Sequence, residues 1–272
     1  MDFTKHTILG GTGLKVGKLG VAASYGAPAR AFEEAFERGC NYFYWGSKRK
    51  SSMLQAIRNI CGKRKRHELV IVIQSYSRSA VLMEVFLKKA LRSLGIDHAD
   101  VLLLGWHNKS PSKRLLDKAL AMKKKGLFGF LGLSGHDREL FPQLAQEGIY
   151  DLFHVRYNAA HRGAEKETFP HLRGESRPGI VSYTATRWGR LLNPKKMPPG
   201  ESPPSAADCY RFVLSNPDVD ICMCGPKNTA QMREALHVLE LGPLSQDELK
   251  RMKRIGDHVH ANAGKFFWAG HE

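Results

Sequence analysis

Short apolar runs alternate along this chain with longer segments of helical periodicity. Runs rich in β-branched, aromatic and leucine residues predict strands at 19–25, 42–45, 69–73, 100–104, 128–133, 152–155, 180–183 and 219–223. Apolar residues three and four apart predict helices at 30–38, 51–60, 80–94, 115–124, 138–145, 206–214 and 229–239, with another expected within 161–174. Eight such strand–helix units predict an α/β fold, a (β/α)8 TIM barrel.

Further elements frame these units. Residues 7–9 and 14–16 flank four consecutive positions rich in glycine and predict an N-terminal β-hairpin. Ser245 and Glu248 form a capping-box pattern that predicts an extra C-terminal helix running to about His260. The segment 193–205 is rich in proline, so we expect a loop insertion and a single domain spanning 1–272. Within 80–94, the apolar residues at helical spacing are Val81, Leu82, Val85, Phe86, Ala90, Leu91 and Leu94.

Composition narrows the class of protein. A hydrophobic content of 42% is enough for a full core, and no apolar run approaches the length of a membrane span. The N-terminus lacks the apolar stretch of a signal peptide, so we expect a soluble, cytoplasmic protein with no membrane partner. The odd number of cysteines shows no paired framework, which favours reduced, buried thiols over a zinc site.

The chain is strongly basic, with a formal net charge of +16. Such a charge attracts anions. The excess is dispersed, and its densest runs, 63–67 and 123–125, are interpreted as solvated loops or helix ends. Because no recognised nucleic-acid module accompanies it, we do not expect a nucleic-acid partner. A monomer or a dimer is expected.

The carboxyl ends of the strands should carry the function, because active sites of such barrels lie there. The residues at these ends are Tyr44, Trp45, Gln74, Tyr76, Trp106, His107, Ser134, His136, His154, Arg156, Tyr157, Tyr183, Arg187, Trp188 and 225–228. They are aromatic, cationic or imidazole side chains without carboxylates, which favours a small, flat ligand that is anionic or aromatic. Three histidines leave zinc binding as a minor alternative, but no metal is expected.

Ordered motifs along the chain resemble those of the aldo-keto reductases. The matching segments are "TGLKVGKLG", "FERGCNYFYW", "LKKALRSLGIDHADVLLL", "GLFGFLGLSGH", "YDLFHVRYNAAHRGAE", "GIVSYTATRWGRLL", "GPKNTAQMREAL" and "PLSQDEL". The resemblance covers nearly the whole chain. It implies a barrel that binds NADP(H) across its mouth and reduces carbonyls by hydride transfer.

The resemblance also exposes a departure at the catalytic positions. The Asp, Tyr, Lys and His of the family's tetrad fall at Tyr44, at Arg49 (Ser47 or Lys48 by other alignments), at Gln74 and at Gly105. In the family, the lysine lowers the pKa of the proton-donating tyrosine. Gln74 has no charge and Gly105 no side chain, so that mechanism does not operate here. Tyr44 and His107 are hypothesised as substitute acids, with Trp45, Arg49, Gln74, Trp106, His136 and Trp188 around the substrate.

More of the family's cofactor positions are retained. Tyr183 falls where an aromatic ring stacks on nicotinamide, and Ser134 and His154 fall at carboxamide contacts, whereas Gly135 replaces an asparagine. Lys227 and Asn228 precede a helix N-terminus, a natural phosphate site, and Lys227 is placed to pair with a 2′-phosphate. The remaining cofactor positions are Gln231 on the adenine side and Arg187 and Arg190 near the pyrophosphate. Core packing for Tyr183 and a solvated loop for Lys227 are the alternatives.

Three hypotheses follow for the function. The first is an aldo-keto-reductase-like oxidoreductase that binds NADP(H) and acts on an unknown carbonyl or alcohol through a non-standard active site. The second is a pseudoenzyme that holds an anionic or aromatic ligand at the barrel mouth without turnover. The third is a different reaction on the same scaffold, because a fold does not determine a function.

Overall fold

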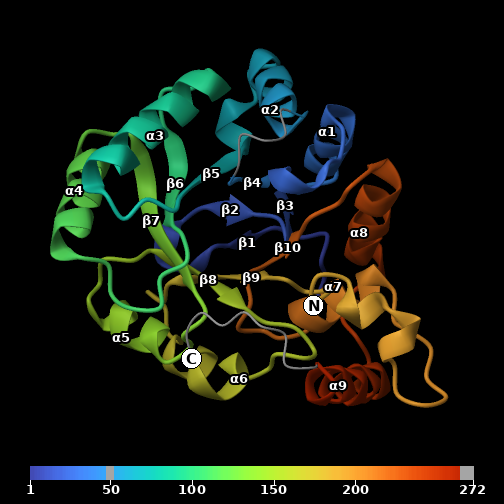
Figure 1. Cartoon of the computed structure of the whole chain (residues 1–272). Coiled ribbons are helices and arrows are strands. Elements are labelled where there is room, and N and C mark those ends of the chain that lie inside the picture. The colour runs from blue at the N-terminus through green and yellow to red at the C-terminus, as the bar shows by residue number, and fades with distance from the viewer. Residues whose placement is uncertain (47–51, 264–272) are drawn as a thin grey trace.

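A closed barrel of eight parallel strands forms the centre of the computed structural model, which describes residues 1–46 and 52–263 (Figure 1). The strands are β3 (Leu19–Ala22), β4 (Tyr42–Trp45), β5 (Val70–Ser75), β6 (Ala99–Leu104), β7 (Phe128–Gly135), β8 (Leu152–Arg156), β9 (Gly179–Tyr183) and β10 (Ile221–Cys224). Each pairs in parallel with the next, and β10 pairs with β3 to close the barrel. The predicted (β/α)8 barrel is confirmed.

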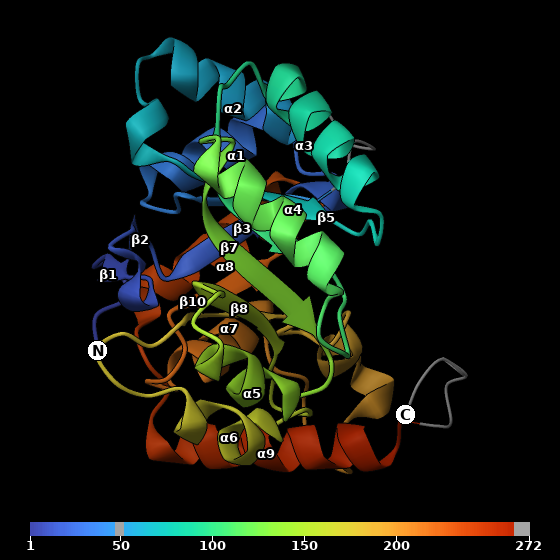
Figure 2. The same cartoon turned by 90° about the vertical axis from the view of Figure 1, so that its left-hand side faces the viewer.

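Helices surround the barrel, and α9 runs along one edge of the molecule (Figure 2). They are α1 (Ala29–Glu37), α2 (Ser52–Gly62), α3 (Ala80–Leu94), α4 (Lys113–Lys124), α5 (Leu140–Gln146), α6 (Ala164–Glu167), α7 (Ala206–Leu214), α8 (Thr229–Leu241) and α9 (Gln246–Ala261). Five begin at a polar cap whose side chain accepts a backbone N–H: Ser79, Ser112, Ser205, Asn228 and Ser245. The capping box predicted at Ser245 and Glu248 is present.

Strand alternation divides the core into two clusters. Tyr42 points into the barrel, whereas the next residue, Phe43, packs outward against Phe32 of α1. The barrel interior is filled by Leu9, Val16, Ala22, Tyr42, Val70, Val72, Val101, Leu103, Leu152, Val181, Ile221 and Met223. The interior is therefore packed and is not a pore, and ligands have access only at its ends.

An N-terminal hairpin closes one end of the barrel. Strands β1 (Thr7–Ile8) and β2 (Lys15–Val16) pair antiparallel around the 3-10 turn η1 (Gly10–Thr12), which confirms the predicted hairpin. Leu9 and Val16 are fully buried with the barrel interior, and Gly11 N donates to Arg177 O at 2.9 Å. At Gly10, a Cβ would lie 2.3 Å from the backbone N of Gly179, so a side chain does not fit. The open mouth is at the carboxyl ends of the strands.

Acidic side chains connect neighbouring strands by hydrogen bonds at the closed end of the barrel. Three aspartates accept a backbone N–H from the preceding strand, in the pairs Asp100 with Ile71, Asp151 with Leu131 and Asp220 with Ile180. Each aspartate also pairs with a base, respectively Arg66, Lys123 and Arg177. The amide oxygen of Asn41 likewise accepts the backbone N–H of Gly17. These barrel carboxylates therefore support the fold at the end opposite the mouth.

Most predicted elements match the structure to within a few residues, and two differ in kind. The strand expected at 19–25 ends at Ala22 and continues as the 3-10 turn η2 (Ala23–Tyr25). The helix expected within 161–174 is reduced to α6 and the 3-10 turn η4 (Phe169–His171). Pro170 explains the second difference, because it lacks an N–H and disfavours helical geometry at the residue before it.

Helix α3 has the predicted bounds but buries a different set of residues. Met83, Leu87, Ala90, Leu91 and Leu94 are buried against the barrel. Four of the apolar residues at helical spacing are instead about half exposed, namely Val81, Leu82, Val85 and Phe86. The first turns of α3 carry apolar residues on both sides of the helix, so periodicity alone did not identify the buried face.

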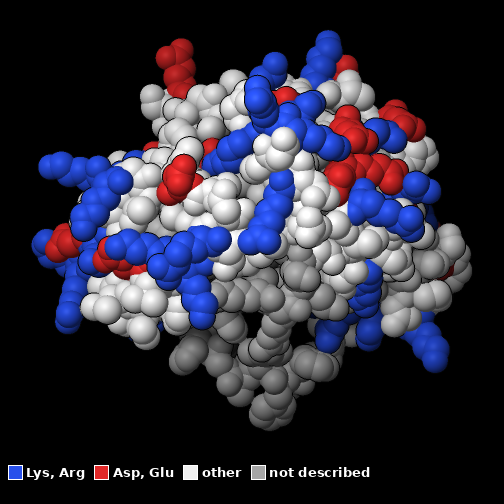
Figure 3. All heavy atoms as spheres, turned by 90° about the horizontal axis from the view of Figure 1, so that it is seen from above, with Lys and Arg blue, Asp and Glu red and all other residues white. Residues whose placement is uncertain are grey.

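The surface mixes charges of both signs. Lys and Arg side chains are spread among acidic and uncharged ones on the face shown in Figure 3. Many of these bases form ion pairs, such as Arg38 with Glu240 and Lys118 with Glu84. Among the described residues, no helix is long and apolar enough to cross a membrane.

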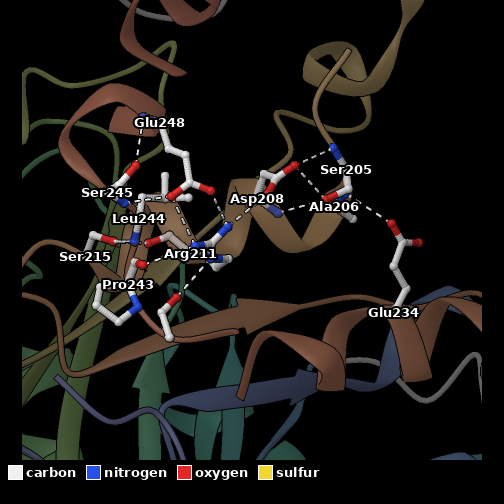
Figure 4. Close-up of polar contacts among 11 residues, drawn as sticks. Ser205, Ala206, Asp208, Arg211, Ser215, Glu234, Pro243, Leu244, Ser245 and Glu248 are labelled. Atoms are coloured by element: carbon white, nitrogen blue, oxygen red, sulfur yellow. Dashed lines mark hydrogen bonds and ion pairs between the residues drawn. The ribbon is translucent and has the colours of Figure 1, made fainter. Parts of the chain in front are cut away.

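Arg211 of α7 ties three helices together (Figure 4). Its guanidinium donates to the carbonyl oxygens of Gly242 at 2.9 Å and Pro243 at 3.1 Å, where α8 ends. It also pairs with Glu248, in the first turn of α9, at 2.9 Å. Glu248 accepts the backbone N–H of Ser245 as well, and these contacts hold its pKa at about 2. One nearly buried side chain thus fixes the ends of α7, α8 and α9.

We expect Arg211→Ala to lower the free energy of unfolding by about 1–2 kcal/mol, because it leaves two partly buried carbonyl groups and Glu248 without their donor. Arg211→Lys keeps the charge but not the forked geometry and should lie in between. Urea denaturation at neutral pH measures both. A loss below about 0.5 kcal/mol for Arg211→Ala, typical of a surface change, would contradict this role.

Candidate functional site

The open mouth is bounded by the last inward-facing residue of each strand. Strand alternation and the interior cluster place Ala22, Tyr44, Gln74, Leu103, Ser134, Arg156, Tyr183 and Met223 there. This ring contains no carboxylate and one permanent charge, that of Arg156. The inner rim therefore combines the phenols of Tyr44 and Tyr183 and the guanidinium of Arg156 with neutral polar and apolar side chains.

A hydrogen bond across the barrel forms the floor of the mouth. Tyr42 Oη lies 2.7 Å from His154 Nε2, although β4 and β8 are on opposite sides of the barrel. Burial lowers the pKa of His154 to about 3 and raises that of Tyr42 well above its usual range. Tyr42 is therefore the donor and His154 Nε2 the acceptor, which places the ring proton of His154 on Nδ1. His154, expected at a carboxamide contact, thus offers an N–H at that atom.

Aromatic rings line the wall above this floor. Tyr44 lies 5.9 Å from the His154 ring, and its hydroxyl hydrogen-bonds with Tyr76. On the other side, His136 stacks on Tyr183 at 6.3 Å and lies 5.8 Å from Trp106. The structure therefore brings Tyr44 and His154 together, and likewise His136, Trp106 and Tyr183. Flat faces of this kind suit an aromatic ligand.

Gln74 and Gly105 complement each other in shape. A Cβ at Gly105 would lie 2.1 Å from Gln74 Nε2, so the amide occupies the space of a side chain at position 105. Gln74 Oε1 is buried and accepts no hydrogen bond from the described residues. The two substitutions thus form one packed arrangement, and a buried acceptor without a donor remains at the mouth.

The backbone at the start of the loop after β6 leaves no room for a side chain at Gly135. A Cβ there would lie 2.0 Å from the carbonyl oxygen of His107, so an asparagine does not fit. His107 N donates to Ser134 O at 2.7 Å, and Trp106 N donates to Ser134 Oγ at 3.0 Å. Ser134 therefore supports this loop with both oxygens. His107 is buried, and its Nε2 has no hydrogen-bond partner among the described residues.

The predicted pocket residues Trp45, Trp188 and Arg49 differ in where they fall. Trp45 is buried on the outer face of β4, beside a cavity of 110 Å³ between the barrel and α3, because alternation turns it away from Tyr44. It is not brought to the mouth. Trp188 is 63% exposed on the loop after β9. Arg49 lies outside the described residues.

Unusual backbone geometry concentrates at the mouth. The described non-glycine residues with positive φ are Arg64, Trp106, Thr184, Arg187 and Trp188. All except Arg64 follow β6 or β9 at the carboxyl ends of the strands. Such conformations cost free energy and cluster at functional sites. The backbone geometry of the loops after β6 and β9 therefore indicates a functional role rather than a purely structural one.

The segment before α8 carries the predicted phosphate residues. Asn228 caps α8 by accepting the N–H of Gln231 at 2.9 Å, and Gln231 Oε1 accepts the N–H of Lys227 at 2.9 Å. Both polar side chains therefore build the helix N-terminus itself. The Lys227 side chain is exposed and forms no ion pair with the described residues.

The two arginines predicted near the pyrophosphate contact the end of α9. Arg187 is buried and donates to Val259 O at 2.6 Å, and Arg190 donates to Ala263 O at 3.3 Å. Basic side chains at a helix C-terminus satisfy its unpaired carbonyls. Arg187 and Arg190 therefore serve at least as caps of this helix.

Two histidines and two tyrosines of the mouth keep their neutral forms near pH 7. Burial lowers the pKa of His107 and, together with the charge of Arg156, that of His136, each to about 4. Burial raises the pKa of Tyr44 and of Tyr183 well above the usual value for tyrosine. Among the described residues, no group of three or more His, Cys, Asp or Glu is placed to hold a metal. Of the two substitute acids proposed from sequence, Tyr44 is therefore a phenol that keeps its proton at neutral pH, and His107 is a neutral imidazole.

Sequence reasoning missed two residues. Tyr42, the partner of His154, was not among the predicted site residues, and Arg156 was named at a strand end without a role. The period of two along β4 and β8 was the available signal, because it places Tyr42 on the face of Tyr44 and Arg156 on the face of His154.

Comparisons with known proteins bear on the fold. No family model matches the chain, and no curated protein matches its sequence. The structure is similar to the aldo-keto reductase AKR11C1 from Bacillus halodurans in its holo form (TM-score 0.75, 17% identity, 92% of this chain and 96% of that one). The apo form gives a TM-score of 0.74 at 17% identity, covering 92% and 95%. PA4992 from Pseudomonas aeruginosa, a proposed aldo-keto reductase, gives 0.67 at 20% identity, covering 86% and 95%.

These similarities extend over most of each chain while sequence identity stays low. The eight parallel strands form the closed barrel expected from the sequence motifs. The chain therefore has the (β/α)8 barrel fold of the aldo-keto reductases.

Proposed function

We propose that this protein is an aldo-keto-reductase-like oxidoreductase that binds NADP(H) across the barrel mouth and acts on a carbonyl or alcohol substrate. The observation that carries the proposal is the convergence of Ser134, His154 and Tyr183 on the inner faces of the adjacent strands β7, β8 and β9. The exposed Lys227 lies at the N-terminus of α8. The shared fold supports this reading.

The residues present fit a nicotinamide dinucleotide in chemical kind. Tyr183 offers a ring, and its hydroxyl, which donates to Gly135 O at 2.9 Å, fixes the orientation of that ring. His154 supplies an N–H for a carboxamide oxygen, with its tautomer set by Tyr42. Lys227 and the backbone N–H groups at the start of α8 suit phosphate oxygens. The asparagine missing at Gly135 removes one amide contact.

A bound nicotinamide would supply or accept the hydride. The Tyr44 hydroxyl would donate a hydrogen bond to the substrate oxygen and is the nearest proton source that the mouth offers. Burial raises the pKa of Tyr44 and makes it a weak acid, because no cation among the described residues lowers that pKa, as a lysine at position 74 would. We therefore expect slow turnover.

A second candidate function is ligand binding without turnover. It is favoured by the absence, among the described mouth residues with resolved shifts, of a pKa near 7: the imidazoles titrate far below and the phenols far above. The ligand would be a small anionic or aromatic molecule. The same binding site serves both candidates, and only catalysis separates them.

Lys227→Ala should weaken NADPH binding about tenfold, the loss typical of one charge-assisted contact, while leaving the weaker binding of NADH nearly unchanged. Calorimetric titration at two salt concentrations measures this, since attraction by the net charge alone vanishes at higher salt. Lys124→Ala, at the end of α4, removes the same charge from the opposite end of the barrel and is the control. No salt-resistant NADPH binding by the wild type would overturn the proposed function.

Tyr44→Phe should lower the NADPH-dependent reduction of a carbonyl substrate about a hundredfold without changing NADPH affinity, because it removes the hydroxyl proposed to donate to the substrate oxygen. His107→Ala, on the other hypothesised acid, is the parallel variant. Steady-state kinetics with a panel of aldehydes and ketones measures both. If the wild type binds NADPH but reduces none of them, binding without turnover is the better description.

The neutral histidines predict acid lability. His107, His136, His154 and His161 have folded pKa values of about 3 to 4, below the ordinary value of 6.5. Between these limits the unfolded chain binds more protons, so stability falls as the pH drops from about 6.5 toward 3. His154→Gln should reduce the slope of the free energy of unfolding against pH by about 1 kcal/mol per pH unit. Urea denaturation between pH 7.5 and 5 measures it, with the exposed His237→Gln as control; equal slopes in all three proteins would contradict a neutral His154.

A further inference from the structure

Arg156 is an arginine that the fold turns inward and that has no partner in the part of the chain that the structure describes. It ends β8, two residues after His154, and is the register partner of Tyr183 on β9. Its side chain belongs to a residue that is only partly exposed. Among the described residues, it forms neither an ion pair nor a hydrogen bond through its guanidinium. It is the one permanent charge on the inner rim of the mouth.

The surroundings of Arg156 are electropositive. The groups that interact with its charge are Tyr183, His136, His161, Arg138 and Arg187. Arg138 is neutralised by Glu167, and Arg187 is bonded to the end of α9, so each of these arginines has its own partner. None of the groups around Arg156 is a carboxylate.

Such a charge is unfavourable for folding alone. Desolvation without a counterion costs free energy, and a buried or half-buried charge is normally paired. Desolvation already lowers the pKa of Arg156, but guanidinium keeps its proton at any ordinary pH. An arrangement of this kind is explained when a ligand supplies the missing anion.

We propose that Arg156 binds an oxyanion of the ligand at the barrel mouth, and that this oxyanion is the carboxylate of a small, flat, aromatic acid. The planar guanidinium matches a carboxylate in two parallel hydrogen bonds. The rings of Tyr183 and His136 lie beside it and provide flat faces for the remainder of the molecule. Substrates of this barrel are therefore carbonyl or alcohol compounds that also carry a carboxylate.

A dinucleotide phosphate is the other source of an oxyanion. The choice between them rests on the proposed function, which places nicotinamide at Tyr183 and the phosphates toward Lys227. Arg156 is the direct neighbour of Tyr183 and so lies at the reacting end of the dinucleotide. This position favours a substrate carboxylate.

The test compares benzoate with its neutral analogue benzamide in titrations of the wild type and Arg156→Gln, without cofactor. We expect benzoate to bind the wild type at moderate salt and to lose about tenfold to hundredfold in affinity in the variant, with benzamide unaffected. Arg156→Lys should recover part of the affinity. Arg173→Gln is the matched control, because it removes the same charge from the loop that precedes β9, at the closed end, where Arg173 pairs with Asp218.

The outcomes separate this inference from the proposed function. Absent benzoate binding, or equal binding by wild type and Arg156→Gln, overturns the inference whatever NADPH does. If NADPH and inorganic pyrophosphate lose affinity in Arg156→Gln and benzoate does not, the oxyanion is a cofactor phosphate and the carboxylate is wrong. Benzoate binding that depends on Arg156, in a protein that does not bind NADPH, overturns the proposed function and leaves this inference standing.

Thermal unfolding provides a second readout. Because Arg156 is unpaired, Arg156→Gln should leave the Tm equal or raise it, and benzoate should raise the Tm of the wild type only. A Tm lowered by several degrees in Arg156→Gln would show that the side chain stabilises the fold and would remove the premise of the inference.

Discussion

The hydrogen bond between Tyr42 and His154 sets the character of the mouth. It joins opposite strands of the barrel, with 2.7 Å between the hydroxyl and Nε2, and fills the space below the rim with two rings. A buried pair of this kind is stable only with a protonated phenol and a neutral imidazole, because neither charge has a counterion there. The floor of the mouth is consequently neutral, rigid and aromatic, and the chemistry above it depends on shape and hydrogen bonding.

Charged groups are arranged differently at the two ends of the barrel. Asp100, Asp151 and Asp220 lie at the closed end, where they accept backbone N–H groups and each pairs with a base. The inner rim of the open end has Arg156 and no acid. The paired charges support the fold at one end, whereas the charge at the other end attracts anions, and the overall charge of +16 adds to that attraction.

Neighbouring positions at the mouth fit one another closely. Gln74 fills the space over Gly105, and the backbone of His107 occupies the place of a side chain at Gly135. A side chain added at either glycine would therefore clash with its neighbours unless they moved.

The sequence by itself determined the barrel, because its strands and helices are distinguished by local periodicity, caps and glycine or proline stops. It also placed aromatic and basic residues at the carboxyl ends of the strands, since these ends can be read from the chain. Tertiary structure decided which of these residues meet. Trp45 and Tyr44 are neighbours in sequence but lie on opposite faces of β4. The first turns of α3 carry apolar residues on two faces of the helix, and only one of these faces is buried. The bond between Tyr42 and His154, the space that Gln74 takes over Gly105 and the unpaired state of Arg156 depend on contacts across the closed barrel, which no local pattern encodes.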